Sequence, residues 1–236
     1  MKDRQFLVTG SSSGIGRAIS EKLLDRGATV IGIARSHQKF QPNTKRYKAI
    51  KTDLSNFETL PAVLKEIISD HPHFDGFVSN AGYGQFAPLE NFSLEQISSY
   101  INVNLISHVM MAKMIIPHFK ANKRGDIVII GSESSLQGAK KGSLYCAAKF
   151  GLRGFSQAIR EECASRNVRV SIINPGMVRT PFFDNLSFSP GSDSSNAIEP
   201  EDVASAAISI FSARIGTVID EINLTPLRKV INFDVQ

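Results

Sequence analysis

The stretch that decides the fold is Thr9-Gly10-Ser11-Ser12-Ser13-Gly14-Ile15-Gly16. It follows an apolar run at 5–9 and leads into a helical pattern, in which apolar residues recur every three or four positions. A strand, a glycine-rich turn and a helix in this order bring backbone N–H groups and the positive end of a helix dipole together. Such a turn can hold a phosphate. The stretch therefore predicts a nucleotide site, and a plain glycine–serine turn is the alternative.

The three glycines have separate tasks in this prediction. Gly10 permits the turn, Gly14 allows the backbone to approach the ligand, and Gly16 allows the helix to pack closely on the strand. The spacing G-x-x-x-G-x-G differs from the commonest dinucleotide fingerprint. The Gly-Lys-Ser/Thr of a P-loop does not follow the turn. We therefore expect a nucleotide site that is not a P-loop.

Outward from this turn, predicted strands and helices alternate along the chain. The strands are continuous apolar runs, which are typical of a parallel sheet covered on both faces. We expect a single doubly wound α/β domain over residues 1–236, a Rossmann-type fold whose mostly parallel sheet has about seven strands. The expected strands are 5–9, 28–34, 47–52, 74–79, 126–130, 168–173 and 217–224, and the expected helices after the first are 57–68, 94–119, 143–165 and 200–211.

Composition limits the class of protein. Of 236 residues, 42% are hydrophobic and 21% charged, which excludes a largely disordered chain. The net charge of +5 does not by itself indicate nucleic-acid binding. Cys146 and Cys163 lie too far apart in one predicted helix to form a disulfide. No run reaches the ~18 apolar residues of a membrane span. We expect a cytoplasmic protein that binds neither nucleic acid nor membrane.

The residues after the second predicted strand indicate which dinucleotide the site takes. An NAD site usually has an acid about 20 residues after the glycines, and this acid accepts a hydrogen bond from the ribose. Ala34-Arg35 stands there instead, and no Asp or Glu occurs from Arg26 to Thr52. The guanidinium of Arg35 suits a 2′-phosphate. We therefore expect NADP(H) in preference to NAD(H), and a solvated basic loop is the alternative.

Tyr145 and Lys149 form the strongest chemical signal. Residues four apart on a helix share a face. An ammonium beside a phenol should lower the phenol's pKa from its usual value near 10, so that the tyrosine can exchange a proton with a substrate oxygen. Helices carry many chance pairs of this spacing. Ser132 strengthens the signal, because it follows a predicted strand at the edge where parallel sheets place their ligands.

With these residues the chain resembles the short-chain dehydrogenase/reductase family, in its single-domain form. The resemblance covers nearly the whole chain, and its motifs are specific jointly rather than singly. The matching stretches, in family order, are Thr9 to Gly16, Asp53-Leu54, Asn80-Ala81-Gly82, Asn102-Val103-Asn104-Leu105, Ser132 with Tyr145 and Lys149, and Asn174-Pro175-Gly176-Met177-Val178-Arg179-Thr180.

The resemblance implies reversible hydride transfer between NADP(H) and a small-molecule carbonyl or secondary alcohol, without a metal. Ser132 would bind the substrate oxygen, and Tyr145 would be the acid-base. Lys149 would bind the nicotinamide ribose and lower the Tyr145 pKa, and Asn104 would hold a water in a proton relay behind Lys149. The implied cofactor contacts are Gly10, Ser12, Ser13, Gly14, Ile15, Gly16, Arg35, Asp53, Leu54, Asn80, Ala81, Gly82, Tyr145, Lys149, Pro175, Gly176, Val178 and Thr180.

The least constrained stretches would shape the substrate pocket: 83–86, 133–137 and 182–188. Glu133 replaces a residue that is often small in the family. Residues 181–198 follow the cofactor-binding Pro-Gly segment and combine phenylalanines with Ser and Asp, which predicts a lid over the substrate. Buried core is the alternative reading of those phenylalanines. The five histidines show no metal-ligand spacing, which predicts exposure or incidental packing for His37, His71, His73, His108 and His118.

Two further expectations concern the whole protein. The resemblance implies a homodimer or homotetramer. A non-catalytic NADP(H)-binding sensor or scaffold is the alternative to an enzyme. The intact set of Asn104, Ser132, Tyr145 and Lys149 counts against that alternative, because a sensor need not keep a proton relay.

Overall fold

The glycine-rich turn joins the first strand to the first helix. In the computed structural model, which describes residues 1–233, strand β1 (Gln5–Thr9) ends at the turn and helix α1 (Gly14–Asp25) begins within it. Gly10 and Gly14 have φ angles of 64° and 51°, in the left-handed region that favours glycine. A Cβ on Gly16 would collide with the carbonyl oxygen of Gly10. The turn therefore requires all three glycines.

The described chain forms one sheet of seven parallel strands in the order β3-β2-β1-β4-β5-β6-β8. The strand order reverses between β1 and β4, which is the switch point where open parallel sheets bind ligands at their carboxyl ends. The expected Rossmann-type fold is confirmed. The strands after β1 are β2 (Thr29–Ala34), β3 (Tyr47–Lys51), β4 (Gly76–Ser79), β5 (Gly125–Ile130), β6 (Val168–Pro175) and β8 (Glu221–Leu224).

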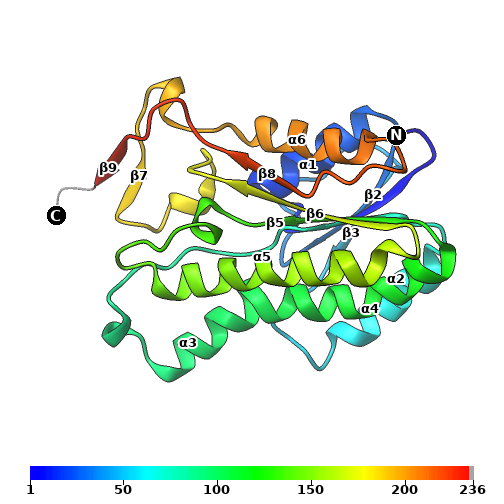
Figure 1. Ribbon diagram of the computed structural model, residues 1–236, viewed down its shortest axis with the longest axis horizontal. Coiled ribbons are helices and arrows are strands. Elements are labelled where there is room, and N and C mark those ends of the chain that lie inside the picture. Colours follow the sequence, from blue (N-terminus) through cyan, green and yellow to red (C-terminus); the bar gives the residue numbers. More distant parts are fainter. Residues whose placement is uncertain (234–236) are drawn as a thin grey trace.

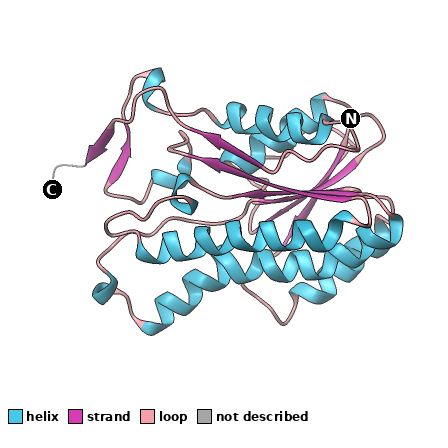
Figure 2. Cartoon of the chain, in the orientation of Figure 1, coloured by secondary structure: helices cyan, strands magenta, loops and turns pink. Residues whose placement is uncertain are grey.

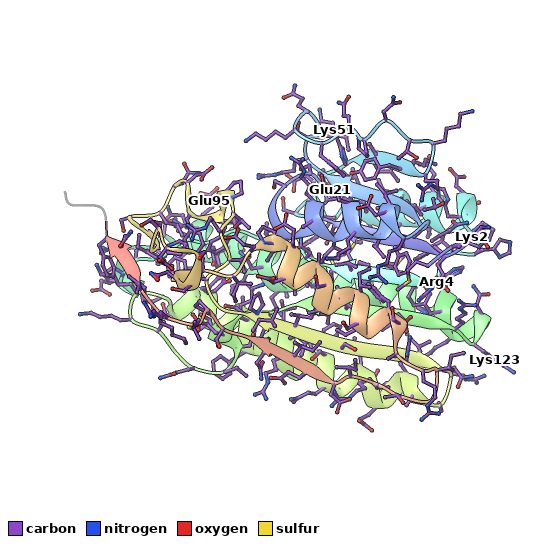
Figure 3. All side chains as sticks on the ribbon, turned by 90° about the horizontal axis from the view of Figure 1, so that it is seen from above. Lys2, Arg4, Glu21, Lys51, Glu95 and Lys123 are labelled. Atoms are coloured by element: carbon purple, nitrogen blue, oxygen red, sulfur yellow. The ribbon has the colours of Figure 1, made fainter. Side chains whose placement is uncertain are left out.

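Helices cover both faces of the sheet (Figures 1 and 2). On one face α1 lies beside α6 (Pro200–Ser212), as Figure 3 shows from above. The other face carries α2 (Leu60–Asp70), α4 (Ser107–Asn122) and α5 (Ser143–Ala164). Strand residues alternate between two buried cores: Phe6 belongs to the core under α1 and α6, and Leu7 to the opposite one. Burial on both faces explains the continuous apolar runs.

The long helix expected at 94–119 is present and runs without a break over 94–122, but it contains a π-helical turn that the sequence did not predict. Helix α3 (Leu94–Ile101) and helix α4 are separated by a π-helical segment, η2 (Asn102–Ile106). A single widened turn hardly changes the spacing of apolar residues, so the sequence pattern does not register it. Such segments occur frequently at functional sites, and Asn104 lies in this one.

Two other predicted elements are shorter than expected. The helix predicted at 57–68 begins at Leu60, because the Asn56 side chain accepts hydrogen bonds from two backbone N–H groups and so forms a turn before it. The strand predicted at 217–224 is confined to β8. The Arg169 guanidinium binds three carbonyl oxygens in the preceding loop and so shapes it as a turn.

Residues 181–198 contain short elements that the sequence did not predict. Strand β7 (Phe188–Pro190) pairs antiparallel with β9 (Ile231–Phe233), away from the main sheet at the left of Figure 1. Three-residue strands are too short to show a periodicity. The 3₁₀ turns are η1 (Leu89–Asn91), η3 (Glu133–Ser135), η4 (Pro181–Phe183) and η5 (Ser194–Asn196).

The two cysteines and the apolarity of the helices were also subjects of prediction. Cys146 and Cys163 are buried and unbridged in α5, as predicted. Among residues 1–233, no helix is long and apolar enough to cross a membrane.

Candidate functional site

The predicted site residues gather at the carboxyl edge of the sheet. Gly10 follows β1, Asn80 follows β4, Ser132 lies just beyond β5, and Gly176 follows β6. These strands are neighbours in the order β1-β4-β5-β6. Residues far apart in the sequence therefore meet along one edge, next to the switch point.

The glycine-rich turn forms a cradle at this edge. In the described chain the side chain of Ser13 does not cap α1, and no acid lies in the first turn of that helix. A Cβ on Gly14 would lie 3.2 Å from Cγ2 of Thr180, so the turn and the segment after β6 are in contact. A helix N-terminus without a side-chain cap or an acid in its first turn fits the pyrophosphate of a dinucleotide. A cavity beside the turn is lined by Ser12, Ser13, Gly14, Arg17, Ala18, Glu21, Lys39, Arg179, Pro181, Pro200 and Glu201.

The segment after β4 is held by Thr9, which the sequence analysis did not single out as a site residue. The buried Thr9 hydroxyl accepts hydrogen bonds from the backbone N–H groups of Asn80 and Ala81, at 2.8 and 3.1 Å. The Asn80 side chain donates in return to the Thr9 carbonyl at 2.9 Å. Thr9 is the last residue of β1, directly before the glycine-rich turn, and this position is the signal that could have identified it.

Asn104 holds the same segment from the other side. Its Oδ1 accepts a hydrogen bond from the backbone N–H of Tyr83 at 3.1 Å, and its Nδ2 donates to the Tyr100 carbonyl at 3.1 Å. A Cβ on Gly82 would lie 2.7 Å from that Oδ1. The π-helical segment thus brings the Asn104 side chain directly against the segment after β4. The role of Asn104 in a proton relay stays a prediction.

His108 is a fixed part of the site, not the incidental packing that the sequence suggested. Its Nε2 lies 2.8 Å from the Ala81 carbonyl, and its Nδ1 lies 2.7 Å from Oγ of Ser79. Because a carbonyl only accepts, Nε2 carries the proton and Nδ1 accepts from the serine. Burial, together with the nearby Lys149 charge, lowers the pKa of His108 to about 3. His108 follows Asn104 by four positions, and this shared helix face is a signal that could have identified it.

Ser132, Tyr145 and Lys149 come together above β5. Ser132 is buried, and its hydroxyl lies near enough to the Tyr145 phenol to favour a lower pKa of that phenol. Tyr145 and Lys149 lie one turn apart on α5, with the Lys149 ammonium 5.7 Å from the centre of the tyrosine ring. That ammonium donates a hydrogen bond to the Ile130 carbonyl at 2.9 Å. A hydroxyl, a phenol and an amine therefore share one small region of the edge.

The expected lowering of the Tyr145 pKa is not found. Burial raises the pKa of Tyr145 to about 12, although the nearby Ser132 hydroxyl acts in the opposite direction. Burial also lowers the pKa of Lys149 to about 8. The sequence-based argument counted only the neighbouring charge, and it could not weigh the loss of solvent around both groups.

The residues expected near the adenine end lie around Arg35. Arg35 is exposed directly after β2, Asp53 is exposed and Leu54 is buried. Hydrogen bonds from the backbone and side chain of Ser55 lower the pKa of Asp53, and the Arg35 charge adds a smaller lowering. Arg35 also acts on the pKa of Tyr83, which burial raises. The Arg35 guanidinium therefore lies near enough to Asp53 and to Tyr83 to act on both side chains.

An aromatic wall surrounds the Tyr145 ring. Its centre lies 5.2 Å from that of Phe86 and 5.9 Å from that of Phe182. Phe188 continues the wall, 5.1 Å from Phe86 and 5.9 Å from Phe183. The stretches that were expected to shape the substrate pocket thus meet beside the tyrosine. Phe182, Phe183 and Phe188 are half-buried. This exposure does not decide between the two alternatives, a lid over the substrate and buried core.

An ion pair, Glu133 with Lys229, lies directly after Ser132 in the chain. Glu133 forms a 2.6 Å ion pair with Lys229, which comes from the segment between β8 and β9. A Cβ on Gly176 would lie 3.4 Å from a Glu133 carboxylate oxygen. Glu133 also contributes to the raised pKa of Tyr145. The chain thus places an acid where the family often has a small residue. In residues 1–233 no cluster of His, Cys, Asp or Glu could hold a metal ion.

Comparison with known proteins identifies relatives over most of the chain. A sequence model described as short chain dehydrogenase matches residues 4–189. The chain is 27% identical to an uncharacterized oxidoreductase of Staphylococcus epidermidis, over 96% of this chain and 99% of the relative. It is 30% identical to a 3-oxoacyl-(acyl-carrier-protein) reductase of Vibrio harveyi, over 91% and 92%. Among solved structures, a metagenomic short-chain oxidoreductase in complex with NADP is 29% identical, with a TM-score of 0.82 over 97% and 99% of the two chains.

Proposed function

Because the chain belongs to the short-chain dehydrogenase family, whose members are oxidoreductases that use a nicotinamide cofactor, we propose that it transfers a hydride between NADP(H) and a carbonyl or secondary alcohol. The observation that carries the proposal is the meeting of Ser132, Tyr145 and Lys149 at the same edge of the sheet as the glycine-rich turn. A hydroxyl pair next to an amine, at the edge that receives a dinucleotide, is suited to proton transfer coupled to hydride transfer.

The side chains have distinct tasks in this mechanism. The bound nicotinamide supplies the hydride in reduction and accepts it in oxidation. In reduction the Tyr145 hydroxyl gives its proton to the substrate oxygen, and the Ser132 hydroxyl donates a hydrogen bond to the same oxygen. In oxidation Tyr145 must first release its own proton to solvent, which a pKa of about 12 disfavours at neutral pH, and the phenolate then accepts the proton of the alcohol. With a pKa of about 12, Tyr145 is protonated at neutral pH, as a proton donor must be.

The chain's own residues also bind and orient the cofactor in this proposal. The turn from Gly10 to Gly16 and the N-terminus of α1 bind the pyrophosphate. Thr9 and His108 fix the backbone of Asn80 to Gly82 along the groove. The other proposed contacts beyond the adenine are Ser12, Ser13, Ile15, Lys149, Pro175, Gly176, Val178 and Thr180.

The aromatic wall supports a substrate with an apolar part beside its carbonyl group. Phe86 and Phe182 lie against the ring of Tyr145 and offer that part a surface away from water. Residues 181–198 act as a lid in this proposal.

Arg35 supports NADP(H) as the cofactor. Its exposed guanidinium lies beside the adenine-end residues, and an acid that would repel a phosphate is absent from residues 26–52. The 29%-identical metagenomic structure contains NADP, which agrees with this choice.

The cofactor experiment measures oxidation of NADPH and NADH with a panel of aldehydes and ketones. We expect kcat/KM to be roughly ten- to a hundredfold higher with NADPH, because a charge-assisted hydrogen bond contributes about 1.5–3 kcal/mol. Arg35→Ala should remove this preference, and Ala34→Asp with Arg35→Ala should reverse it. Arg26→Ala, a change of another exposed arginine, serves as the control and should leave the preference intact.

Two results would contradict the proposal. Equal rates with both cofactors in the unaltered protein would show that Arg35 does not bind a 2′-phosphate. Tight NADPH binding without oxidation by any carbonyl compound would instead favour a sensor or scaffold.

A further inference from the structure

A network of side-chain hydrogen bonds connects the glycine-rich turn to the loop that carries Arg35. The Ser11 hydroxyl lies 2.9 Å from the Tyr47 hydroxyl, and that hydroxyl lies 3.2 Å from Nδ1 of His37. Nε2 of His37 lies 3.1 Å from the Ile50 carbonyl. We refer to these three side chains as the Ser11–Tyr47–His37 network.

The direction of the network follows from its last member. The Ile50 carbonyl can only accept, so Nε2 of His37 donates and Nδ1 is left as an acceptor. The Tyr47 hydroxyl then donates to Nδ1, and its oxygen is free to accept from the Ser11 hydroxyl at 2.9 Å. The Ile33 carbonyl, at 3.5 Å, is a longer alternative acceptor for the Ser11 proton. A network satisfied in this way fixes the positions of its members more firmly than separate contacts would.

The surrounding residues make room for the network. Gly32, in the middle of β2, lies under the paired hydroxyls, and a Cβ there would collide with the Tyr47 oxygen. The Tyr47 ring is held edge-on against Phe40, with 5.0 Å between ring centres. Ser11 is fully buried and His37 is 9% exposed. The contact between β3 and the turn is therefore a built feature of the interior.

The network fixes both sides of the cofactor groove. Ser11 lies inside the glycine-rich turn, and His37 lies two residues after Arg35. Arg35 and Ser36 are exposed between two buried anchors. Ala34 is held by the pairing of β2 with β3, and His37 is held by the network. The place of the Arg35 guanidinium relative to the turn thus depends on His37.

We propose that Ser11, Tyr47 and His37 are positioning residues for cofactor choice, which place Arg35 against the 2′-phosphate of NADP(H). The proposal rests on the NADP(H) preference proposed above. NAD(H) has no phosphate at that position, so its binding does not depend on where the guanidinium lies. Loss of the network weakens NADPH binding selectively, whereas a general loosening of the turn would weaken both cofactors.

The test measures dissociation constants of NADPH and NADH by calorimetric titration, which needs no substrate. Tyr47→Phe keeps the ring against Phe40 and removes the hydroxyl. We expect NADPH to bind about three- to tenfold more weakly, as for the loss of one or two net hydrogen bonds, and NADH to bind unchanged. His37→Phe keeps a ring of similar size and removes the acceptor of the Tyr47 hydroxyl; it should act in the same way and covers the case in which Tyr47→Phe does not fold. Ser36→Ala removes a hydroxyl beside Arg35 but outside the network, and should change neither constant.

A double-mutant cycle separates this proposal from the cofactor proposal on which it rests. Arg35→Ala alone reports whether the guanidinium selects NADPH. If it does, adding Tyr47→Phe to Arg35→Ala should have no further effect on NADPH binding, because the network acts through Arg35. Equal weakening of both cofactors by Tyr47→Phe, additive effects in the cycle, or no change in either constant would overturn the positioning role. An unchanged NADPH preference in Arg35→Ala would instead overturn the assignment of that preference to Arg35.

Discussion

At the scale of single residues, burial sets the protonation states around Tyr145. It raises the pKa of Tyr145 to about 12 and lowers that of His108 to about 3. Both side chains are therefore neutral near pH 7, as the proposed role of Tyr145 as a proton donor and the hydrogen bonds of His108 require. Lys149 differs, because burial lowers its pKa only to about 8, so its charge changes within an accessible pH range.

The titration of Lys149 predicts how stability changes with pH. An unfolded lysine has a pKa near 10.4, so between about pH 8 and pH 10 the unfolded chain holds a proton that the folded chain has released. The contribution of Lys149 to the free energy of unfolding therefore rises with pH in this window. Relative to Lys149→Met, the wild type should gain about 1–2 kcal/mol between about pH 7.5 and 9.5, measured by urea denaturation.

The exposed Lys113 on α4 offers a matched control. Lys113→Met should show a stability difference from the wild type that is nearly independent of pH. The same flat profile for Lys149→Met would mean that the buried ammonium titrates in the folded protein as it does in the unfolded one.

At the scale of elements, the proposed lid is anchored more firmly than its sequence indicated. β7 pairs with β9, and the Arg179 guanidinium bonds to Glu199 and to the carbonyls of Gly191 and Asp193. The stretch 182–187 before β7 forms no strand and carries the phenylalanines against Tyr145. If residues 181–198 form a lid, we therefore expect opening to concern 182–187 first and β7 to move only together with β9.

Hydrogen exchange can test this division of the lid. Backbone amides at 182–187 should exchange fast in the free protein, because they lack strand pairing, and more slowly with NADPH and a carbonyl substrate. Amides of β7 and β9 should respond together, and those of β5 should remain unchanged as an internal reference. Strong and equal protection of 182–187 in both states would assign these residues to the core.

At the scale of the whole molecule, the two edges of the sheet have different tasks. At the amino edge, Asp126 forms ion pairs of 2.7 Å with Arg4 and 2.6 Å with Arg169, and all three side chains are largely buried. The carboxyl edge carries the glycine-rich turn and the proposed catalytic residues. Charge is thus neutralised where the strands begin, and polar groups are left for ligands where they end.

The sequence could predict those elements whose residues form a regular local pattern. Strands such as β5 and β6 are buried on both faces and appear as unbroken apolar runs, so their positions could be predicted closely. The π-helical turn at Asn104 and the pairing of β7 with β9 have no local periodicity. They depend on contacts between residues that are distant in the sequence.

The same distinction applies to the candidate site. The glycine turn, Tyr145 and Lys149 could be named because spacing alone places them on one turn or one helix face. Thr9 and His108 were not predicted as site residues. Their hydrogen bonds to the segment after β4 form only when β1, β4 and α4 pack together. The direction of the Tyr145 pKa shift was missed for a related reason: burial is a property of the whole molecule.

The central claim is that Tyr145 gives and takes the proton that accompanies hydride transfer, and Tyr145→Phe tests it most directly. The variant keeps the ring among Phe86 and Phe182 and removes only the hydroxyl. With NADPH and a carbonyl substrate that the wild type reduces, we predict that kcat falls by about a hundredfold or more, as expected for the loss of general acid catalysis. The NADPH dissociation constant should stay nearly the same. A kcat close to that of the wild type would contradict the account.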